Sequence, residues 1–449
     1  MKNGSRARTG RPRGPAMLMS LAALLSMFLA GPAKVPAVPP EAGRPERIVL
    51  ATGQECFYQK DTASSITVVE IFIPGGKNAV PPGKDGLAYL AARIALEIPD
   101  FTVAQDIMAQ ATRMRLAVLE DCTVLSVECL SDNLEAALRV ASEIIQDPLV
   151  TGLRIDNIKR GMELYARAGE DDAGDAGHAA ALGAFFRGQG YGSSTYGTEA
   201  SRKAIEKRDV SAFFGRQFTR NGIFYSVCSD LERSRVQPLL ERYFSKFPSG
   251  DAPSLPAATA VVPADRRVTL ERDFKQAYVA RAFLLPPASG PAYAKGCLLE
   301  VLLGVGPGSR LWRLRAAERL AYNVGARSTW ARGNGLLEAY LETENAKRGQ
   351  AVTALDAVLT SLHDKGVTDD ELRLTKSLAR GHLLRTFEAK KQRAQIAGLW
   401  RVLGLGFDGL PDALEGIEAV SAAELNAFIA EVLDPERSLL VVVGGRDGR

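Results

Sequence analysis

The residues best suited to bind a catalytic metal are the three histidines of the chain, His178, His363 and His382. The closest two, His363 and His382, lie 19 residues apart (382 − 363). In the H-E-x-x-H and H-x-x-E-H patterns, two imidazoles stand about one helical turn apart and so reach the same zinc ion. Neither pattern can be written in this sequence. We therefore expect all three histidines to be surface or loop residues.

Nucleophile, phosphate and thiolate sites are not indicated either. No G-x-S-x-G sequence is present to hold a catalytic serine, and the stretch GVGPGSR at 304–310 lacks the lysine of a phosphate-binding loop. The five cysteines are odd in number, widely spread and without a C-x-x-C pair, which argues against a disulfide framework or a thiolate zinc site. Cys122 and Cys228 lie in apolar runs and are predicted core residues. We expect this chain to hold no metal or cofactor of its own.

The charge of the chain argues against a nucleic-acid partner. Its 56 basic and 52 acidic residues give a net charge of +4. Five of the basic residues fall within the first 13 positions, where no acidic residue occurs: Lys2, Arg6, Arg8, Arg11 and Arg13. The rest of the chain therefore has 51 basic and 52 acidic residues, a net charge of −1. Such a near-neutral chain does not predict a phosphate-binding surface.

The N-terminal segment is typical of an export signal. The apolar run AMLMSLAALLSMFLA at 16–30 follows the basic residues, and GPAKVPAVPP then offers small residues for cleavage. We assign residues 1–37 to a signal peptide and expect the mature protein in the periplasm or outside the cell. An uncleaved membrane anchor is the alternative, although 15 residues are short of the roughly 20 that a spanning helix needs. Membrane contact is expected only in that case.

The remaining chain is long enough for two domains, and it repeats one pattern. Residues 248–266 are rich in Pro, Ala, Ser and Gly and predict a linker between domains at 45–247 and 267–446. Each half ends with an amphipathic stretch, which holds Ala212-Phe213-Phe214 in the first half and Ala427-Phe428-Ile429 in the second, at an offset of 215 residues. An apolar strand follows each stretch, GIFYSVC in the first half and SLLVVVGG in the second. This repetition indicates an internal duplication.

The elements of each half predict an α+β fold. Alternating or continuous apolar residues favour strands at 66–73 and 123–129. Apolar residues at helical spacing predict a helix over 132–146 with Asp132 as its N-cap. Strands mixed with long helices, twice over, predict two homologous domains, each with a mixed or antiparallel sheet packed against helices.

The segment PGGKNAVPPGKDGLAYLAARIALE at 74–97 resembles the zinc-site segment of the insulinase and pitrilysin family of metallopeptidases. These enzymes carry an inverted H-x-x-E-H motif and are related to the mitochondrial processing peptidase. Their zinc helix opens with Gly-Leu-Ala-His. Here Gly86-Leu87-Ala88 is kept, but Tyr89 stands at the first ligand position, Ala92 at the catalytic glutamate and Arg93 at the second histidine. The resemblance therefore implies the family's clam-shell fold with a degenerate zinc motif, and Arg93 would repel a cation there.

The resemblance extends over nearly the whole mature chain. The stretches CLSDNLEAAL at 129–138 and RGQGYGSSTYGTEASRKAI at 187–205 are also similar to family segments. In the family a glutamate roughly 75 residues after the motif is the third zinc ligand. Glu163 lies in a suitable helical stretch, but we interpret it as a solvated residue because a single carboxylate without imidazoles is a poor zinc site.

A second segment, LLGVGPGSRLWRLRAAERLAYNV at 302–324, resembles the part of the second half that reaches the substrate in active relatives. There an arginine and a tyrosine seven residues apart are supplied to the zinc site, and the matching residues are Arg315 and Tyr322. The resemblance implies that both donate hydrogen bonds to the scissile carbonyl oxygen. Seven residues are about two helical turns, so both side chains can leave one helix face. Substrate contact is also predicted for the glycines of the turn, whose backbone allows close approach: Gly304, Gly306 and Gly308.

Other interpretations of this segment stay open. Arg313, Arg315 and Arg319 can form an ordinary basic helix face, with Tyr322 in the core and the glycines in a simple strand-to-helix turn. The segment is also one residue shorter than the usual pattern, and Arg319 stands where glycine is common. If the missing residue falls after the helix, Ala316 takes the arginine position, whereas Tyr322 keeps its assignment.

The resemblance implies a non-catalytic subunit. Some members of the family divide the work between a chain with the H-x-x-E-H zinc site and a chain with only the Arg/Tyr pair. This chain would then form a heterodimer with an H-x-x-E-H partner that holds the zinc, and would contribute to peptide hydrolysis there. The competing hypothesis is a non-enzymatic scaffold or peptide-binding protein on the same fold.

Overall fold

One mixed sheet carries the first half of the chain. The computed structural model describes residues 44–98, 100–253, 257 and 259–445. The first sheet has six strands in the order β1-β2-β6-β3-β5-β4, and all neighbouring pairs are antiparallel except β2 and β6. The strands are β1 (Glu46–Val49), β2 (Glu55–Lys60), β3 (Ile66–Pro74), β4 (Arg113–Val118), β5 (Cys122–Leu130) and β6 (Phe224–Ser229).

The second half builds a sheet of the same kind. Five strands follow one another in the order β7-β11-β8-β10-β9, and only β7 and β11 are parallel. The strands are β7 (Arg267–Glu271), β8 (Gln276–Leu285), β9 (Asn323–Thr329), β10 (Gly335–Glu344) and β11 (Leu439–Gly444).

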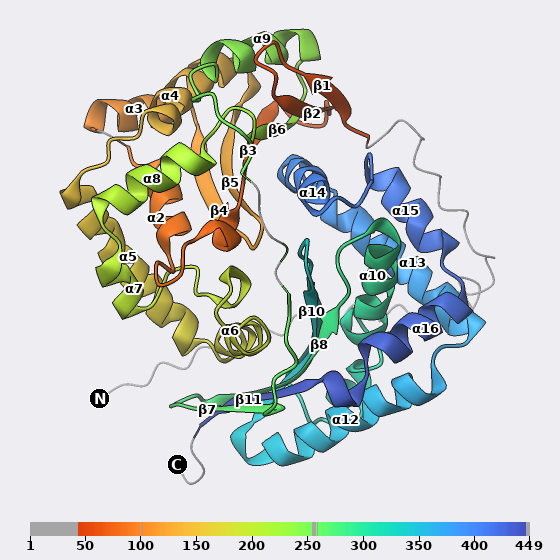
Figure 1. Cartoon of the computed structure of the whole chain (residues 1–449). Coiled ribbons are helices and arrows are strands. Elements are labelled where there is room, and N and C mark those ends of the chain that lie inside the picture. Colours follow the sequence, from red (N-terminus) through yellow and green to blue (C-terminus); the bar gives the residue numbers. More distant parts are fainter. Residues whose placement is uncertain (1–43, 99, 254–256, 258, 446–449) are drawn as a thin grey trace, which may run out of the picture. The chain divides into compact units, whose positions relative to one another are not determined.

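The two sheets share one topology (Figure 1). Across the second sheet, β7, β11, β8, β10 and β9 take the places that β2, β6, β3, β5 and β4 have in the first. β11 begins 215 residues after β6 (439 − 224), as the repeated pattern predicted. The predicted strands at 66–73 and 123–129 form β3 and β5. The predicted α+β class with two homologous halves is confirmed.

Helices cover both sheets. In the first half they are α2 (Leu87–Ile94), α3 (Phe101–Ala109), α4 (Leu134–Gln146), α5 (Gly152–Asp171), α6 (Ala173–Phe185), α7 (Glu199–Ala204), α8 (Lys207–Gln217) and α9 (Arg233–Tyr243). In the second half they are α10 (Gly290–Gly304), α11 (Trp312–Ala316), α12 (Arg348–Lys365), α13 (Asp369–Thr386), α14 (Lys390–Leu403), α15 (Leu410–Ala419) and α16 (Ala422–Val432). Among the described helices, none is both long and apolar enough to cross a membrane.

The predicted helix over 132–146 begins later than expected. Residues Ser131–Asn133 form a 3-10 turn, and α4 then starts at Leu134. Asp132 is therefore not the N-cap, and the side chain of Asn133, which precedes α4, makes no capping bond either. The tight turn leads the chain from β5 into the helix without a capping side chain, a common role of 3-10 turns. The apolar residues at helical spacing, among them Leu138 and Ile145, are buried as predicted.

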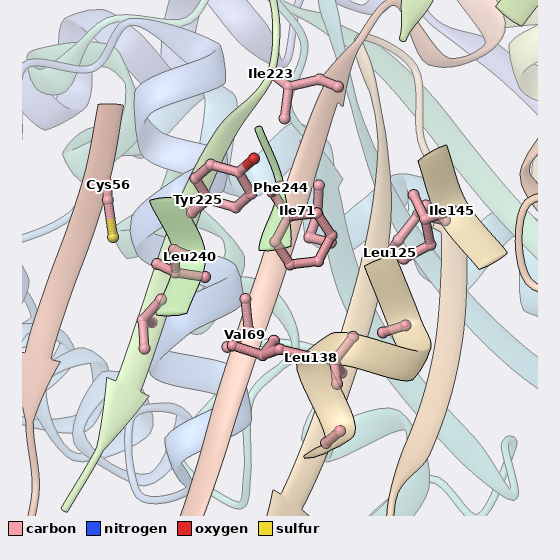
Figure 2. Close-up of a cluster of buried hydrophobic side chains, with 14 of the residues drawn as sticks. Cys56, Val69, Ile71, Leu125, Leu138, Ile145, Ile223, Tyr225, Leu240 and Phe244 are labelled. Carbon is pink, nitrogen blue, oxygen red and sulfur yellow. The ribbon is translucent and has the colours of Figure 1, made fainter. Parts of the chain in front are cut away.

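The side chains of β3 alternate between two apolar layers. Val69 and Ile71 belong to the cluster in Figure 2, where residues of α4 and α9 pack against the sheet. Val68 and Phe72 point to the opposite face, where they pack with residues of α14. Burial on both faces explains why this strand is an almost continuous apolar run rather than a simple alternation.

Each half places one helix on the sheet of the other half. α6 packs on β8 and β11 of the second sheet, whereas α14 packs on β3 and β6 of the first (Figure 1). Glycine permits both contacts: a Cβ at Gly177 of α6 would lie 2.6 Å from the ring of Tyr278, and one at Gly398 of α14 would lie 2.1 Å from the ring of Phe72. The two halves are thereby joined in one compact unit.

Two predictions concern the core and the chain boundaries. Cys122 and Cys228 are buried and unpaired, as predicted. No helix or strand occurs between α9 and β7 in the described residues 244–253, 257 and 259–266, while the domain limits at 45–247, 248–266 and 267–446 stay a prediction. The predicted signal peptide at 1–37 lies outside the described residues.

Candidate functional site

Helix α2 carries the degenerate zinc motif. Leu87 and Ala88 are buried in a cluster with Ile158 and Met162 of α5, so the kept Gly86-Leu87-Ala88 sequence fixes the start of α2 against that helix. Tyr89 is half-buried at the edge of the cluster, and Ala92 is buried on the sheet side. The segment that resembles the zinc motif therefore forms a helix packed between α5 and the first sheet.

The side chains at this position do not fit a zinc ion. Arg93 forms an ion pair with Glu97 at 3.0 Å and donates a hydrogen bond to the backbone oxygen of Leu96 at 3.2 Å. Zinc is bound in proteins by imidazole, thiolate or carboxylate groups, and a guanidinium and a methyl group supply none of these. In the described part of the chain, no group of three His, Cys, Asp or Glu side chains is placed to hold a metal.

Three aromatic rings gather beside the motif position. The ring of Tyr89 lies 4.9 Å from that of Tyr196 and 6.4 Å from that of Tyr165, and Tyr165 and Tyr196 are 5.4 Å apart. We call these residues the tyrosine cluster. Burial raises the pKa of Tyr89 and of Tyr196, so these phenols stay protonated at neutral pH. The cluster joins α2, α5 and the loop that holds Tyr196.

Glu163 does not approach the motif. It forms an ion pair with Arg167 on the outer side of α5, which agrees with its interpretation as a solvated residue. Residues two positions apart on a helix point in nearly opposite directions, so Tyr165 and Glu163 leave different sides of α5. It is Tyr165 that contacts Tyr89. Sequence reasoning missed this contact and the third ring, that of Tyr196.

The structure explains why two positions of the Gly-rich turn are occupied by glycine. Gly304 ends α10, and a Cβ there would lie 2.0 Å from the backbone nitrogen of Ala326 on β9. Gly306 has a φ of +75°, a left-handed conformation that glycine adopts without strain. A Cβ at Gly308 would lie 3.2 Å from a methyl group of Leu378. The predicted substrate contact of these glycines stays a prediction.

Arg315 and Tyr322 do not share one helix face, so that expectation is wrong. Helix α11 ends at Ala316, Arg319 has a φ of +52°, and β9 begins at Asn323. The chain leaves the helix because Leu320 turns inward: its side chain is buried, and its backbone N–H donates to the oxygen of Leu314 at 2.9 Å. Arg315 thus comes from a short helix and Tyr322 from the entry to a strand.

Both side chains of the Arg/Tyr pair are nevertheless exposed. The guanidinium of Arg315 lies 4.9 Å from the ring centre of Trp312. Tyr322 is 53% exposed, and its hydroxyl donates a hydrogen bond to Glu344 at 3.1 Å. That hydrogen bond raises the pKa of Tyr322. Tyr322 is therefore not a core residue, and its phenol is accessible to another molecule.

His178 is not a simple surface or loop residue, so this expectation is also wrong. It lies on α6, and its Nδ1 is bonded to the carboxylate of Glu338 on β10, which is 1% exposed. The Arg327 guanidinium on β9 donates to the same carboxylate at 2.8 Å. Although burial opposes ionisation, the hydrogen bond and charge of His178 and the charge of Arg327 lower the pKa of Glu338. A polar cluster thus joins the two halves where α6 crosses the second sheet.

Fold and site together define a class of protein. The chain has two homologous α+β halves, a helix at the place of an H-x-x-E-H motif, and an exposed Arg/Tyr segment in the second half. Among the described residues, the motif helix carries no zinc ligand. These are features of a metallopeptidase-like fold whose motif helix, as described, offers no zinc ligand.

Comparisons with known proteins agree with this class. Residues 204–378 match the family model described as Peptidase M16 inactive domain. The non-peptidase homolog YmxG of Helicobacter pylori is 22% identical over 380 residues, which cover 83% of this chain and 88% of that protein. An uncharacterized zinc protease of Mycobacterium leprae is 22% identical over 340 residues, 74% of this chain and 76% of that protein.

A solved structure supports the same fold. The crystal structure of a peptidase M16 inactive domain from Pseudomonas fluorescens superposes with a TM-score of 0.81 at 18% identity, over 90% of this chain and 99% of that chain. These matches support the resemblance to the M16 peptidase family, and in particular to its inactive members.

Proposed function

We propose that this chain is the catalytically incomplete subunit of a heteromeric zinc metallopeptidase. Its partner would be an M16 subunit with an intact H-x-x-E-H motif, and the substrate would be a peptide in the chamber between the two. The observation that carries this proposal is the pairing of a lost zinc site with an accessible Arg/Tyr segment: Tyr89, Ala92 and Arg93 replace the motif, while Tyr322 is exposed.

The role of this chain in the reaction would be electrostatic. Zinc and its glutamate base in the partner would activate water for attack on the peptide carbonyl. The Arg315 guanidinium and the Tyr322 phenol would donate hydrogen bonds to the carbonyl oxygen, where negative charge develops. Tyr322 would exchange its hydrogen bond to Glu344 for one to the substrate. Both groups are free to reach outward because neither is buried in the core of this chain.

The test is purification of the tagged full chain from its native cells. We expect a stoichiometric partner that carries H-x-x-E-H, zinc in the complex, and peptide hydrolysis by the pair but by neither chain alone. Mass spectrometry identifies the partner, and elemental analysis gives the zinc content. A stable partner without the motif, together with no peptidase activity in the complex, would contradict the proposal.

A non-enzymatic scaffold or peptide-binding protein is the second candidate. Two observations favour it: the relative from Helicobacter pylori is named a non-peptidase homolog, and Tyr165 of the tyrosine cluster is exposed and offers an aromatic surface to a bound chain. In this case the complex would form and bind peptide, but substitution of Tyr322 would leave every activity of the complex unchanged. We also propose that the protein is exported, on the basis of its N-terminal sequence.

A further inference from the structure

A cavity of about 450 Å³ lies between the two halves, away from the motif helix and the Arg/Tyr segment. The first half lines it with the turn that joins β4 to β5 and with His178 of α6. The second half lines it with the end of β9 and with residues of α10 and α14. The two helices that each half places on the other's sheet, α6 and α14, therefore both contribute to its wall. Ligand sites in proteins commonly have this size and lie at such domain junctions.

Most of the cavity wall is apolar, and one side of it is aromatic. Trp330 and Trp400 line it together with Tyr293, whose ring centre lies 5.5 Å and 6.1 Å from theirs. Aliphatic side chains of α14, among them Leu399 and Val402, cover another side. Aromatic faces attract cations as well as apolar groups, because the ring carries negative charge density on its faces.

His178 places one edge of its imidazole ring in the wall of the cavity. Its Nδ1 is bonded to Glu338, and the pKa of that carboxylate is lowered, so it is ionised and can only accept. Nδ1 of His178 therefore donates its proton to this carboxylate. Within the described residues, no group is bonded to Nε2. Any hydrogen bond from His178 to a molecule in the cavity uses this atom.

Two carboxylates in the wall, those of Asp121 and Glu120, favour a ligand that donates hydrogen bonds. Asp121 already accepts hydrogen bonds from the Tyr191 hydroxyl at 2.7 Å and from the Arg332 backbone N–H at 2.8 Å. Glu120 pairs with Lys77 at 3.0 Å and also lines the cavity. Both carboxylates are acceptors. The charge of Glu120 is balanced by Lys77, whereas no cation among the described residues forms an ion pair with Asp121, whose charge would repel an anionic ligand. A ligand here must offer a donor, and a positive charge would be favoured.

We propose that this cavity binds a small arylalkyl amine or a molecule of that class, with the ammonium group toward Asp121 and Glu120 and the apolar body against Trp330 and Trp400. This site is independent of the proposed peptidase function, since it uses none of the residues assigned to it. The ammonium group of such a ligand would donate to the carboxylates of the wall, and its apolar body would contact the tryptophan rings.

The experiment uses three matched probes that differ in the head group: 2-phenylethylamine, 2-phenylethanol and 3-phenylpropanoate. The chain has three tryptophans, and a Trp312→Phe background leaves the two in the cavity as the fluorescence signal. We expect saturable quenching by the amine, with half-saturation at a concentration at least about tenfold lower than that of the carboxylate. The alcohol, a donor without charge, should fall between them.

Variants separate the cavity from the protein surface. Val402→Phe fills the cavity and should abolish the saturable change, whereas the control Leu374→Phe, on the exposed side of α13, should not alter it. If Val402→Phe does not fold, Glu120→Gln carries the test, because it keeps the side-chain shape and should reduce the preference for amine over carboxylate several-fold. No saturable quenching by the amine, equal binding of the carboxylate, or an unchanged preference in Glu120→Gln would overturn the proposal.

Discussion

Gly398 of α14 lies against the ring of Phe72 on β3, so closely that a Cβ at position 398 would be 2.1 Å from the ring. Phe72 comes from the first half of the chain and Gly398 from the second, and both are at the contact where α14 covers the first sheet. Phe72 is fully buried and stacks on Phe224 at 4.8 Å, so the ring has no space to move aside. This position therefore links the two halves and tolerates no side chain.

The Gly398→Ala variant should lower the free energy of unfolding. Alanine is the better helix former, yet the added methyl group would overlap the Phe72 ring, and overpacking of a core contact typically costs about 1–3 kcal/mol. Chemical denaturation of the full chain measures the change. Gly161→Ala on α5 is the matched control, because a Cβ there meets no atom within 4 Å, and it should instead raise the stability by about 0.5–1 kcal/mol. Equal effects of the two substitutions would contradict the argument.

A buried carboxyl group at Glu70 on β3 makes the stability depend on pH. Burial raises the pKa of Glu70 from 4.5 to about 7, and the charge of Glu128 adds a smaller increase. The hydrogen bond from Ser126 at 2.5 Å and the charge of Lys391 lower it, but they do not offset the burial. Its Oε1 atom has no hydrogen-bond partner among the described residues. Because the folded-state pKa lies above the unfolded one, this group's contribution is fully present below about pH 4.5 and is lost as the pH rises through about 7.

The Glu70→Gln variant should remove this loss. At pH 5 it should be nearly as stable as the wild type, and at pH 8 it should be more stable by up to about 3 kcal/mol, the equivalent of the pKa shift. Chemical denaturation of both proteins at both pH values measures the free energy of unfolding. Subtracting the wild-type value from the variant value at each pH removes the contributions of other titrating groups. A difference that is the same at pH 5 and pH 8 would show that Glu70 does not titrate as inferred.

Much of the fold could be predicted because its signals are local. The apolar runs of β3 and β5 and the repeated endings at β6 and β11 are contiguous in sequence, and the kept Gly86-Leu87-Ala88 located the motif helix. The exchange of α6 and α14 could not be predicted, since an apolar helix face does not say which sheet it covers. The same holds for Tyr165 beside Tyr89 and for Glu338, which lies 160 residues from His178, because single residues carry no periodic signal for distant contacts.

The purified chain alone should bind no stoichiometric zinc. The motif positions hold Tyr89, Ala92 and Arg93, the phenol of Tyr89 stays protonated, and Arg93 adds a positive charge. Elemental analysis after dialysis against a weak chelator should give well below one zinc per chain, and no peptide should be hydrolysed. One tightly held zinc per chain would show that another ligand set exists.

The N-terminus of the exported protein should lie between about residue 30 and residue 40, where the small residues that follow the apolar run offer a cleavage site. Intact mass spectrometry of exported material decides this. A full-length species that requires detergent for extraction would instead identify the segment as a membrane anchor.

The last prediction concerns Tyr322 in the reconstituted pair with an H-x-x-E-H partner. Tyr322→Phe removes one hydrogen-bond donor and keeps the ring, and because the side chain is 53% exposed the fold should be unaffected. Loss of one donor from a preorganised site typically costs roughly 3 kcal/mol, so turnover should fall about 100-fold while the complex stays intact by size-exclusion chromatography.

Two arginine variants complete this test. Arg315→Ala should lower turnover in the same way, whereas Arg313→Ala should be nearly silent because its side chain leaves another part of α11 and pairs with Glu318 at 3.6 Å. If Arg315→Ala is silent but Tyr322→Phe is not, the arginine position falls on Ala316, and the tyrosine alone acts on the substrate. Full activity of both Tyr322→Phe and Arg315→Ala in an intact complex would remove the catalytic role of this segment, and the scaffold function would then account for the exposed pair.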